Sequence, residues 1–156
     1  MKAENAVRKG APILPPTYLL IAILLMVGVH FAAPIIQVVP GSWKITGLIP
    51  LFLGLIMSIG GDSQFKKEKT AIKPFDEPSI MVTGGWFKIS RNPMYLGFIL
   101  VLVGVSFLLG SLASFLVIFL FAIVIQMRFI RFEEKMMAET FGKDWNQYVQ
   151  KVRRWI

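Results

Sequence analysis

Two clusters of charged and aromatic residues could together bind a small charged molecule. The first is Arg91-Asn92-Pro93-Met94-Tyr95, which leads directly into a long apolar run. Proline suits the first turn of a helix, and the free N–H groups at a helix start favour an anionic ligand group. The second is Glu133-Glu134, which follows the next apolar run and could accept hydrogen bonds from an amine or a hydroxyl. Taken alone, each of these groups could also belong to an ordinary solvated surface.

A third distinctive segment lies near the C-terminus. It is predicted to start a new helix, with Asp144 as the N-cap. Five of its residues recur at helical spacing, so they share one helix face, and that face must rest on the bilayer surface or on a loop folded back over the spans. These residues are Phe141, Trp145, Tyr148, Val149 and Val152.

The composition excludes several kinds of chemistry. The chain has no cysteine, so it can form neither a disulfide, nor a thiolate metal site, nor a cysteine nucleophile. Its single histidine, His30, excludes a metal site built from several histidines, and we predict no metal. His30 and Gln37 are seven residues apart in one apolar run, on one predicted helix face, where His30 could have a direct role or simply pair with an amide or a carbonyl group.

The elements that must position these residues are membrane helices. Of the 156 residues, 55% are hydrophobic and 17% are charged, whereas soluble domains have about 45–50% apolar and about 25% charged residues. The charge-free stretch from Met94 to Met127 is too long for a single span of about 30 Å, so it should break at Gly110-Ser111. We predict one all-α membrane domain over residues 1–156, with four spans at 17–39, 45–61, 94–109 and 112–130, a cytoplasmic loop at 62–93 and a cytoplasmic helical tail at 131–156.

The distribution of charge predicts the orientation of this bundle. The net charge is +8, and with four spans 16 of the 17 lysines and arginines fall on one side, Lys44 being the exception. Cytoplasmic segments of membrane proteins are enriched in these residues. Both termini are therefore predicted to be cytoplasmic in a multi-pass protein of the plasma or inner membrane. No base-contacting element is apparent, so we expect no nucleic acid partner.

Small residues recur every seven positions in two of the predicted spans. Such a repeat keeps them on one helix face, where they allow two backbones to approach closely. Packing between helices is the main interpretation, although a glycine can also leave room for a ligand. The two series are Gly47, Gly54, Gly61 and Gly97, Gly104, Ser111.

The order of these motifs resembles that of the isoprenylcysteine carboxyl methyltransferase family and its phospholipid methyltransferase relatives. The family pattern is Arg-His-Pro-x-Tyr, two closely spaced spans, Glu-Glu, and a Phe-Gly…Tyr…Tyr…Arg tail, and the resemblance extends from about Val82 to Arg154. It implies a methyltransferase whose S-adenosyl-L-methionine site lies at the cytoplasmic membrane face, under a C-terminal helix. By that resemblance, the cofactor-binding residues are Arg91, Asn92, Pro93, Tyr95, Leu96, Gly97, Glu133, Glu134, Tyr148 and Arg153.

The sequence departs from the family pattern at Asn92, where the family usually has histidine. Asparagine keeps a donor and an acceptor, but it cannot titrate near neutral pH. Trp145, where a tyrosine is common, is a milder change. Ligand binding at position 92 is therefore compatible with the sequence, whereas proton transfer there is not.

A lipophilic acceptor from the bilayer, such as an isoprenylcysteine carboxylate or another lipid, is the expected substrate. Arg128 and Arg131, at the cytoplasmic end of the fourth predicted span, are candidate catalytic residues that could hold an anionic acceptor group. The sequence contains no obvious base, which favours an acceptor that is already nucleophilic. The alternatives are a phospholipid N-methyltransferase and a non-catalytic membrane scaffold or subunit, while one lone histidine argues against a transporter.

Overall fold

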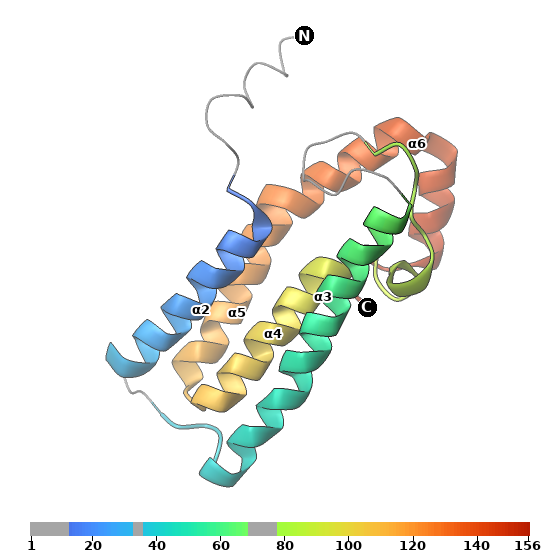
Figure 1. Cartoon of the computed structure of the whole chain (residues 1–156). Helices are drawn as coiled ribbons and strands as arrows, with labels where there is room; N and C mark the ends of the chain where they lie inside the picture. The colour runs from blue at the N-terminus through green and yellow to red at the C-terminus, as the bar shows by residue number, and fades with distance from the viewer. Residues whose placement is uncertain (1–12, 33–35, 69–77) are drawn as a thin grey trace.

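The computed structural model describes residues 13–32, 36–68 and 78–156, which form an all-helical bundle. The apolar helices run up and down beside one another, and the C-terminal helix bends over one end of the bundle (Figure 1). Extended pairing within the described residues is limited to an isolated bridge between Gln37 and Ser111. The elements are α2 (Pro15–Ala32), the 3-10 helix η1 (Gly41–Gly47), α3 (Leu48–Lys67), the 3-10 helix η2 (Gly85–Lys88), α4 (Pro93–Leu109), α5 (Leu112–Ile125), the π-helical segment η3 (Gln126–Ile130) and α6 (Arg131–Lys151).

Within the described residues, three helical segments are long and apolar enough to cross a membrane. They are α2 with 18 residues, the continuous segment Gly41–Lys67 with 27 residues, and the continuous segment Leu112–Lys151 with 40 residues. The fourth apolar helix, α4, has 17 residues and lies at the lower limit of about 17 residues for a span. A helix of 40 residues is about 60 Å long, twice a hydrocarbon core of about 30 Å. Only the apolar part of that helix, which ends at Ile130, can therefore lie within the bilayer.

The ends of α2 and α3 differ from the predicted ones. The first helix ends at Ala32, and Gln37 lies in the bridge beyond it, so the prediction that Gln37 shares a helix face with His30 is wrong. At the other end of the bundle, α3 continues to Lys67, so the predicted loop at 62–93 begins too early. The extension contains an ion pair of 2.6 Å between Asp62 and Lys66, and opposite charges four residues apart support a helix.

The hairpin between α4 and α5 forms at the predicted position. Gly110 ends α4 in a left-handed conformation with φ 76°, which glycine adopts without the steric cost of a side chain. The carbonyl group of Gly110 accepts hydrogen bonds from the backbone N–H groups of Val38 and Val39, at 2.8 and 3.3 Å. The turn is thus joined to the segment that precedes η1.

The contact between α3 and α4 is built on the predicted glycine seam. A side chain on Gly54 would collide with the backbone of α4 at Gly97 and Val101, and one on Gly47 would collide with the backbone at Gly104. The two backbones therefore touch, as expected where small residues rather than apolar bulk hold membrane helices together. The packing interpretation is confirmed for Gly47, Gly54 and Gly104, and Gly97, which was expected at the cofactor site, packs in the same seam.

The long C-terminal helix carries two irregularities. The π-helical segment η3 joins α5 to α6 without a break, and its Phe129 and Ile130 belong to the buried core with Ile125. Further along, Gly142 has φ 48° and ψ −108°, which bends α6. The tail helix predicted to start at Asp144 is therefore the second half of α6, and the bend turns it over the end of the bundle (Figure 1).

Candidate functional site

A cavity lies at the end of the bundle where α3 ends, α4 begins and α6 bends. Its walls come from the C-terminal end of α3, the segment leading to α4, the first turn of α4 and both halves of α6. The lining residues are Phe65, Pro78, Ile80, Val82, Phe87, Arg91, Asn92, Pro93, Met94, Tyr95, Glu133, Glu134, Met136, Met137, Trp145 and Tyr148.

Glu133 is joined to the start of α4 by a short hydrogen bond. The Tyr95 hydroxyl donates to Glu133 Oε1 at 2.6 Å, so the two motifs touch directly. Glu133 lies beyond the apolar part of the long helix, and burial raises the pKa of its carboxyl group, while the hydrogen bond from Tyr95 offsets part of that rise. This acid can therefore change protonation state much closer to neutral pH than an exposed glutamate can.

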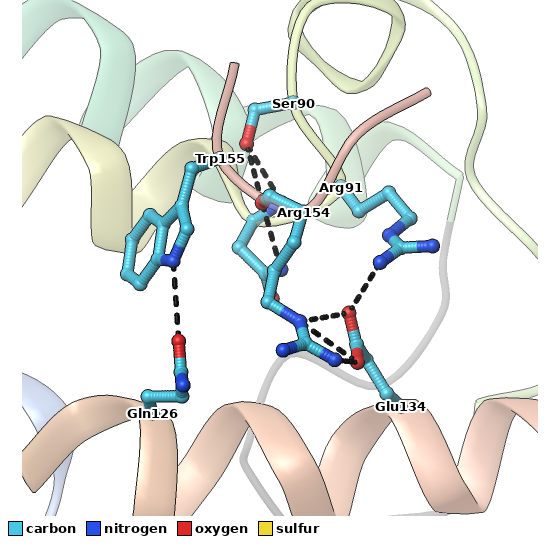
Figure 2. A network of polar contacts seen from close by, with 7 residues as sticks. Ser90, Arg91, Gln126, Glu134, Arg154 and Trp155 are labelled. Atoms are coloured by element: carbon cyan, nitrogen blue, oxygen red, sulfur yellow. Dashed lines mark hydrogen bonds and ion pairs between the residues drawn. The ribbon is translucent and has the colours of Figure 1, made fainter. Parts of the chain in front are cut away.

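Glu134 lies between two guanidinium groups, as Figure 2 shows. Arg91 Nη2 is 3.0 Å from Glu134 Oε1. From the other side, Arg154 Nε donates to Glu134 Oε1 at 3.0 Å and Arg154 Nη2 donates to Oε2 at 2.5 Å. Forked contacts of this kind between arginine and a carboxylate are strong and directional.

Arg91 combines burial with unused hydrogen-bonding capacity. Its side chain is only 9% exposed, and its guanidinium carbon lies 5.6 Å from the centre of the Trp145 ring, a cation–π distance. Its buried Nε has no hydrogen-bond partner among the residues that the structure describes. A buried donor without a partner is costly, so an anionic group in the cavity would be well placed to satisfy it.

The second half of α6 covers one side of the cavity. Trp145 and Tyr148 are 7% and 8% exposed, and the Tyr148 hydroxyl donates to the carbonyl oxygen of Phe87 at 2.6 Å. This contact links α6 to the 3-10 helix η2. The bend at Gly142 is what brings these two rings back towards the start of α4.

The residues predicted to bind a cofactor divide into two groups. Seven line the cavity, namely Arg91, Asn92, Pro93, Tyr95, Glu133, Glu134 and Tyr148. Leu96 and Gly97 do not line it; Gly97 instead packs against Gly54 and Ser58 of α3. The side chain of Arg153 is exposed and lies outside the cavity lining.

Arg128 and Arg131, the predicted catalytic pair, do not face the cavity. Both are exposed and neither lines it. Arg128 lies inside the π-helical segment, which has more residues per turn than an α-helix and so changes the direction of the side chains around it. In this structure no cavity contact supports a role for either arginine at the reacting atoms.

Several site residues escaped the sequence-based reasoning. Arg154, which was not among the predicted residues, pairs with Glu134, and the chain leaves helical geometry at Val152 shortly before it. Met136 and Met137 of α6 form part of the apolar wall of the cavity. The sequence indicated them only as an apolar pair among charged residues. Trp145 was expected on a packed face, but its contact with Arg91 was not expected.

The geometry excludes the arrangement expected of a scaffold, in which the two motifs diverge. Contacts of 2.6 Å between Tyr95 and Glu133 and of 3.0 Å between Arg91 and Glu134 bring them together. In the part of the chain that the structure describes, no group of three or more acidic, histidine or cysteine side chains could hold a metal ion. The cavity is thus formed by two arginine- and glutamate-bearing segments, with aromatic and apolar walls.

Comparison with known proteins agrees with this architecture. The fold is similar to that of the eukaryotic intramembrane Ras methyltransferase ICMT (isoprenylcysteine carboxyl methyltransferase), solved without a monobody, with a TM-score of 0.66 and 19% sequence identity. The similarity covers 90% of this chain and 51% of that one, so the chain matches about half of the eukaryotic enzyme. An uncharacterized protein of Haemophilus influenzae is 36% identical over 63 residues, which are 40% of this chain and 100% of that protein.

The family model for phospholipid methyltransferases matches residues 43–144. That range contains the glycine seam, the segment Arg91–Tyr95, the hairpin and Glu133-Glu134. It therefore includes both segments that meet at the cavity and most of the bundle that positions them. The chain belongs to the phospholipid methyltransferase family, a family of membrane methyltransferases.

Proposed function

We propose that this chain transfers a methyl group from S-adenosyl-L-methionine to a lipophilic acceptor that enters from the bilayer. The observation that carries the proposal is the meeting of Arg91, Tyr95, Glu133 and Glu134 at one cavity at the end of the bundle. This cavity offers both signs of charge beside aromatic rings. S-adenosyl-L-methionine has a carboxylate, an ammonium group, ribose hydroxyls, an adenine ring and a sulfonium, so it needs such a mixture.

The residues fit this cofactor group by group. Arg91 has a buried donor for which none of the described residues is a partner, and it can bind the carboxylate. Glu133 can accept hydrogen bonds from the ammonium group or the ribose hydroxyls. The rings of Tyr95, Trp145 and Tyr148 can pack against adenine or the sulfonium. When bound, the cofactor supplies an electrophilic methyl group, and the chain contributes alignment and exclusion of water.

The acceptor is proposed to approach from the membrane. The cavity opens at the end of apolar helices, and its wall includes Phe65, Met94, Met136 and Met137, which suit an acyl or prenyl chain. With the positive charge gathered at the same end as the cavity, that end is proposed to face the cytoplasm. The cofactor would then enter from the aqueous side and the acceptor laterally.

A phospholipid amine is a second candidate acceptor. An ammonium acceptor must lose a proton before it can attack a methyl group. Glu133 faces the cavity, and burial raises its pKa, so it could take that proton near neutral pH. The family match is also compatible with this acceptor. A carboxylate acceptor such as an isoprenylcysteine would need no base.

The experiment is methyl transfer from labelled S-adenosyl-L-methionine in membranes that contain the protein. We expect label in the lipid fraction, and mass spectrometry of the product distinguishes an ester from an N-methyl headgroup. Glu133→Gln keeps the size of the side chain but removes its charge and basicity. It should abolish transfer to an amine, whereas transfer to a carboxylate should be weakened through cofactor binding alone. Absence of label in every lipid, with the wild-type protein present and folded, would contradict the proposal.

A further inference from the structure

The segment that follows α6 is held against the start of α4 by three hydrogen bonds. The backbone N–H of Arg91 donates to the carbonyl oxygen of Arg153 at 3.0 Å. The Ser90 hydroxyl and the Asn92 side-chain amide both donate to the carbonyl oxygen of Arg154, each at 3.1 Å. Ser90 and Asn92 are 0% and 7% exposed. The buried clamp formed by Ser90 and Asn92 therefore fixes the backbone from which the Arg154 side chain extends. Figure 2 shows Ser90 beside Arg154.

The two arginines bind Glu134 in different ways. Arg154 uses two nitrogens on both carboxylate oxygens, at 2.5 to 3.1 Å, whereas Arg91 makes a single contact at 3.0 Å. The Arg154 side chain is 38% exposed and does not line the cavity; the Arg91 side chain is 9% exposed and does. The charge of Glu134 is thus balanced mainly from outside the cavity, by Arg154.

This division of contacts leaves a complementary pair inside the cavity. Two guanidinium groups and two carboxylates meet here, and once Arg154 balances Glu134 the remaining cation and acid are Arg91 and Glu133. The amino-acid end of S-adenosyl-L-methionine carries one negative and one positive charge. Without Arg154, the negative charge of Glu134 would be balanced by Arg91 alone, its other guanidinium neighbour.

We propose that Arg154 is a positioning residue that balances Glu134 and so keeps the Arg91 cation available to the carboxylate of the cofactor. The clamp formed by Ser90 and Asn92 holds the backbone of Arg154 in this position. Asn92 therefore has a structural role at the position where the family usually has histidine. This inference rests on the proposed function. It predicts that removing the Arg154 charge weakens recognition of the cofactor carboxylate specifically. A general loss of folding or affinity would not agree with this prediction.

The test compares two ligands that differ only in the carboxylate, S-adenosyl-L-methionine and decarboxylated S-adenosyl-L-methionine, by calorimetry on the purified full chain. We expect Arg154→Gln to weaken binding of the first by about tenfold more than binding of the second, as for loss of a hydrogen bond to a charged group. The double variant Arg154→Gln/Glu134→Gln also lacks the unbalanced negative charge of Glu134, so it should regain most of the preference for S-adenosyl-L-methionine over the decarboxylated ligand. Arg154→Lys keeps the positive charge at position 154 and should retain part of this preference. Lys151→Gln removes an exposed positive charge from the same segment and is the matched control, expected to keep the wild-type preference.

Equal weakening of both ligands by Arg154→Gln, or no restoration in the double variant, would overturn the inference and leave the proposed function standing. Arg154→Lys behaving like Arg154→Gln would also overturn it, because charge would then not be the cause. If the wild-type protein binds neither ligand, the proposed function itself fails. The ratio of the two affinities is measured on one protein sample, so a partly unfolded variant cannot imitate the expected result.

Discussion

At the scale of single residues, the contact of 2.6 Å between Tyr95 and Glu133 links the start of α4 directly to α6. The hydroxyl of Tyr95 donates to a carboxylate that burial makes harder to ionise. Because a hydrogen bond to the ionised form stabilises it, Tyr95 lowers the pKa of Glu133 from the value that burial alone would produce. The acid is therefore kept available in its charged form by a partner on another helix.

Tyr95→Phe should therefore make cofactor binding more dependent on pH. Loss of the hydroxyl raises the pKa of Glu133 further, so a larger fraction is protonated at neutral pH and unable to bind a cation. We expect affinity for S-adenosyl-L-methionine to fall by about tenfold near pH 7 and to recover as pH rises, with the midpoint shifted upward from that of the wild type. Calorimetry across a pH series measures this. Tyr18→Phe, which removes a hydroxyl from α2 outside the cavity, is the control; a midpoint that stays in place or moves down in Tyr95→Phe would refute the argument.

The arginines show what sequence spacing can and cannot predict at this scale. Arg91 and the Glu-Glu pair were correctly expected to lie together, because their positions flank one short hairpin. Arg153 was predicted to bind the cofactor, but it lies outside the cavity lining, and the neighbouring Arg154 pairs with Glu134. The backbone changes from helical to extended at Val152, and a change of conformation alternates the directions of successive side chains. Ser90 and Asn92, far away in the sequence, donate hydrogen bonds to the Arg154 carbonyl oxygen and hold the backbone from which Arg154 reaches Glu134.

At the scale of elements, the glycine seam determines how close α3 and α4 can approach. The spacing of small residues every seven positions predicted this seam. The hairpin at Gly110 was also predicted from the sequence, because the charge-free stretch from Met94 to Met127 is too long to cross a bilayer as one straight helix. The π-helical segment and the direction of Arg128 and Arg131 were not predictable, since an extra residue in one helical turn leaves no compositional signal. The continuation of α3 to Lys67 contains an ion pair that the sequence allows but does not require.

Gly54→Ala should destabilise the bundle. The added methyl group would collide with the backbone of α4 at Gly97 and Val101, which cannot move as a flexible side chain could. Overpacking of this kind costs about 1–3 kcal/mol, so we expect a lower unfolding temperature of the purified protein in detergent. Gly28→Ala is the matched control, because Gly28 also lies within a helix but has nothing within 4 Å of the added group. Equal unfolding temperatures for the two variants would mean that the seam does not hold these helices together.

At the scale of the whole molecule, the bundle has two chemically different ends. The cavity, the bend of α6 and the start of α2 lie at one end, whereas η1 and the turn at Gly110 lie at the other (Figure 1). Among the residues that the structure describes, Lys44 lies in η1, whereas α6 and the segments that line the cavity carry most of the other lysines and arginines. In the same described part of the chain, three helical segments meet the length and composition of a span and α4 lies at the limit, so the four-span topology and its orientation stay predictions.

The lack of cysteine allows a direct test of this topology, because each single-cysteine variant carries one thiol. Ser42→Cys places a thiol in η1, and Thr140→Cys places one on the exposed surface of α6. With a membrane-impermeant maleimide, we expect Thr140→Cys to react only from the cytoplasmic side of bacterial membrane vesicles and Ser42→Cys only from the opposite side. Labelling of both positions from one side would show that the bundle does not cross the membrane as predicted.

The most direct measurement of the central claim is calorimetric titration of S-adenosyl-L-methionine into the purified wild-type protein and into Tyr95→Ala and Glu133→Ala, one variant from each segment of the cavity. Because both segments are proposed to close around the same molecule, the wild type should bind one cofactor per chain and both variants should bind it much more weakly. No binding by the wild type, or full affinity in either variant, would contradict the account.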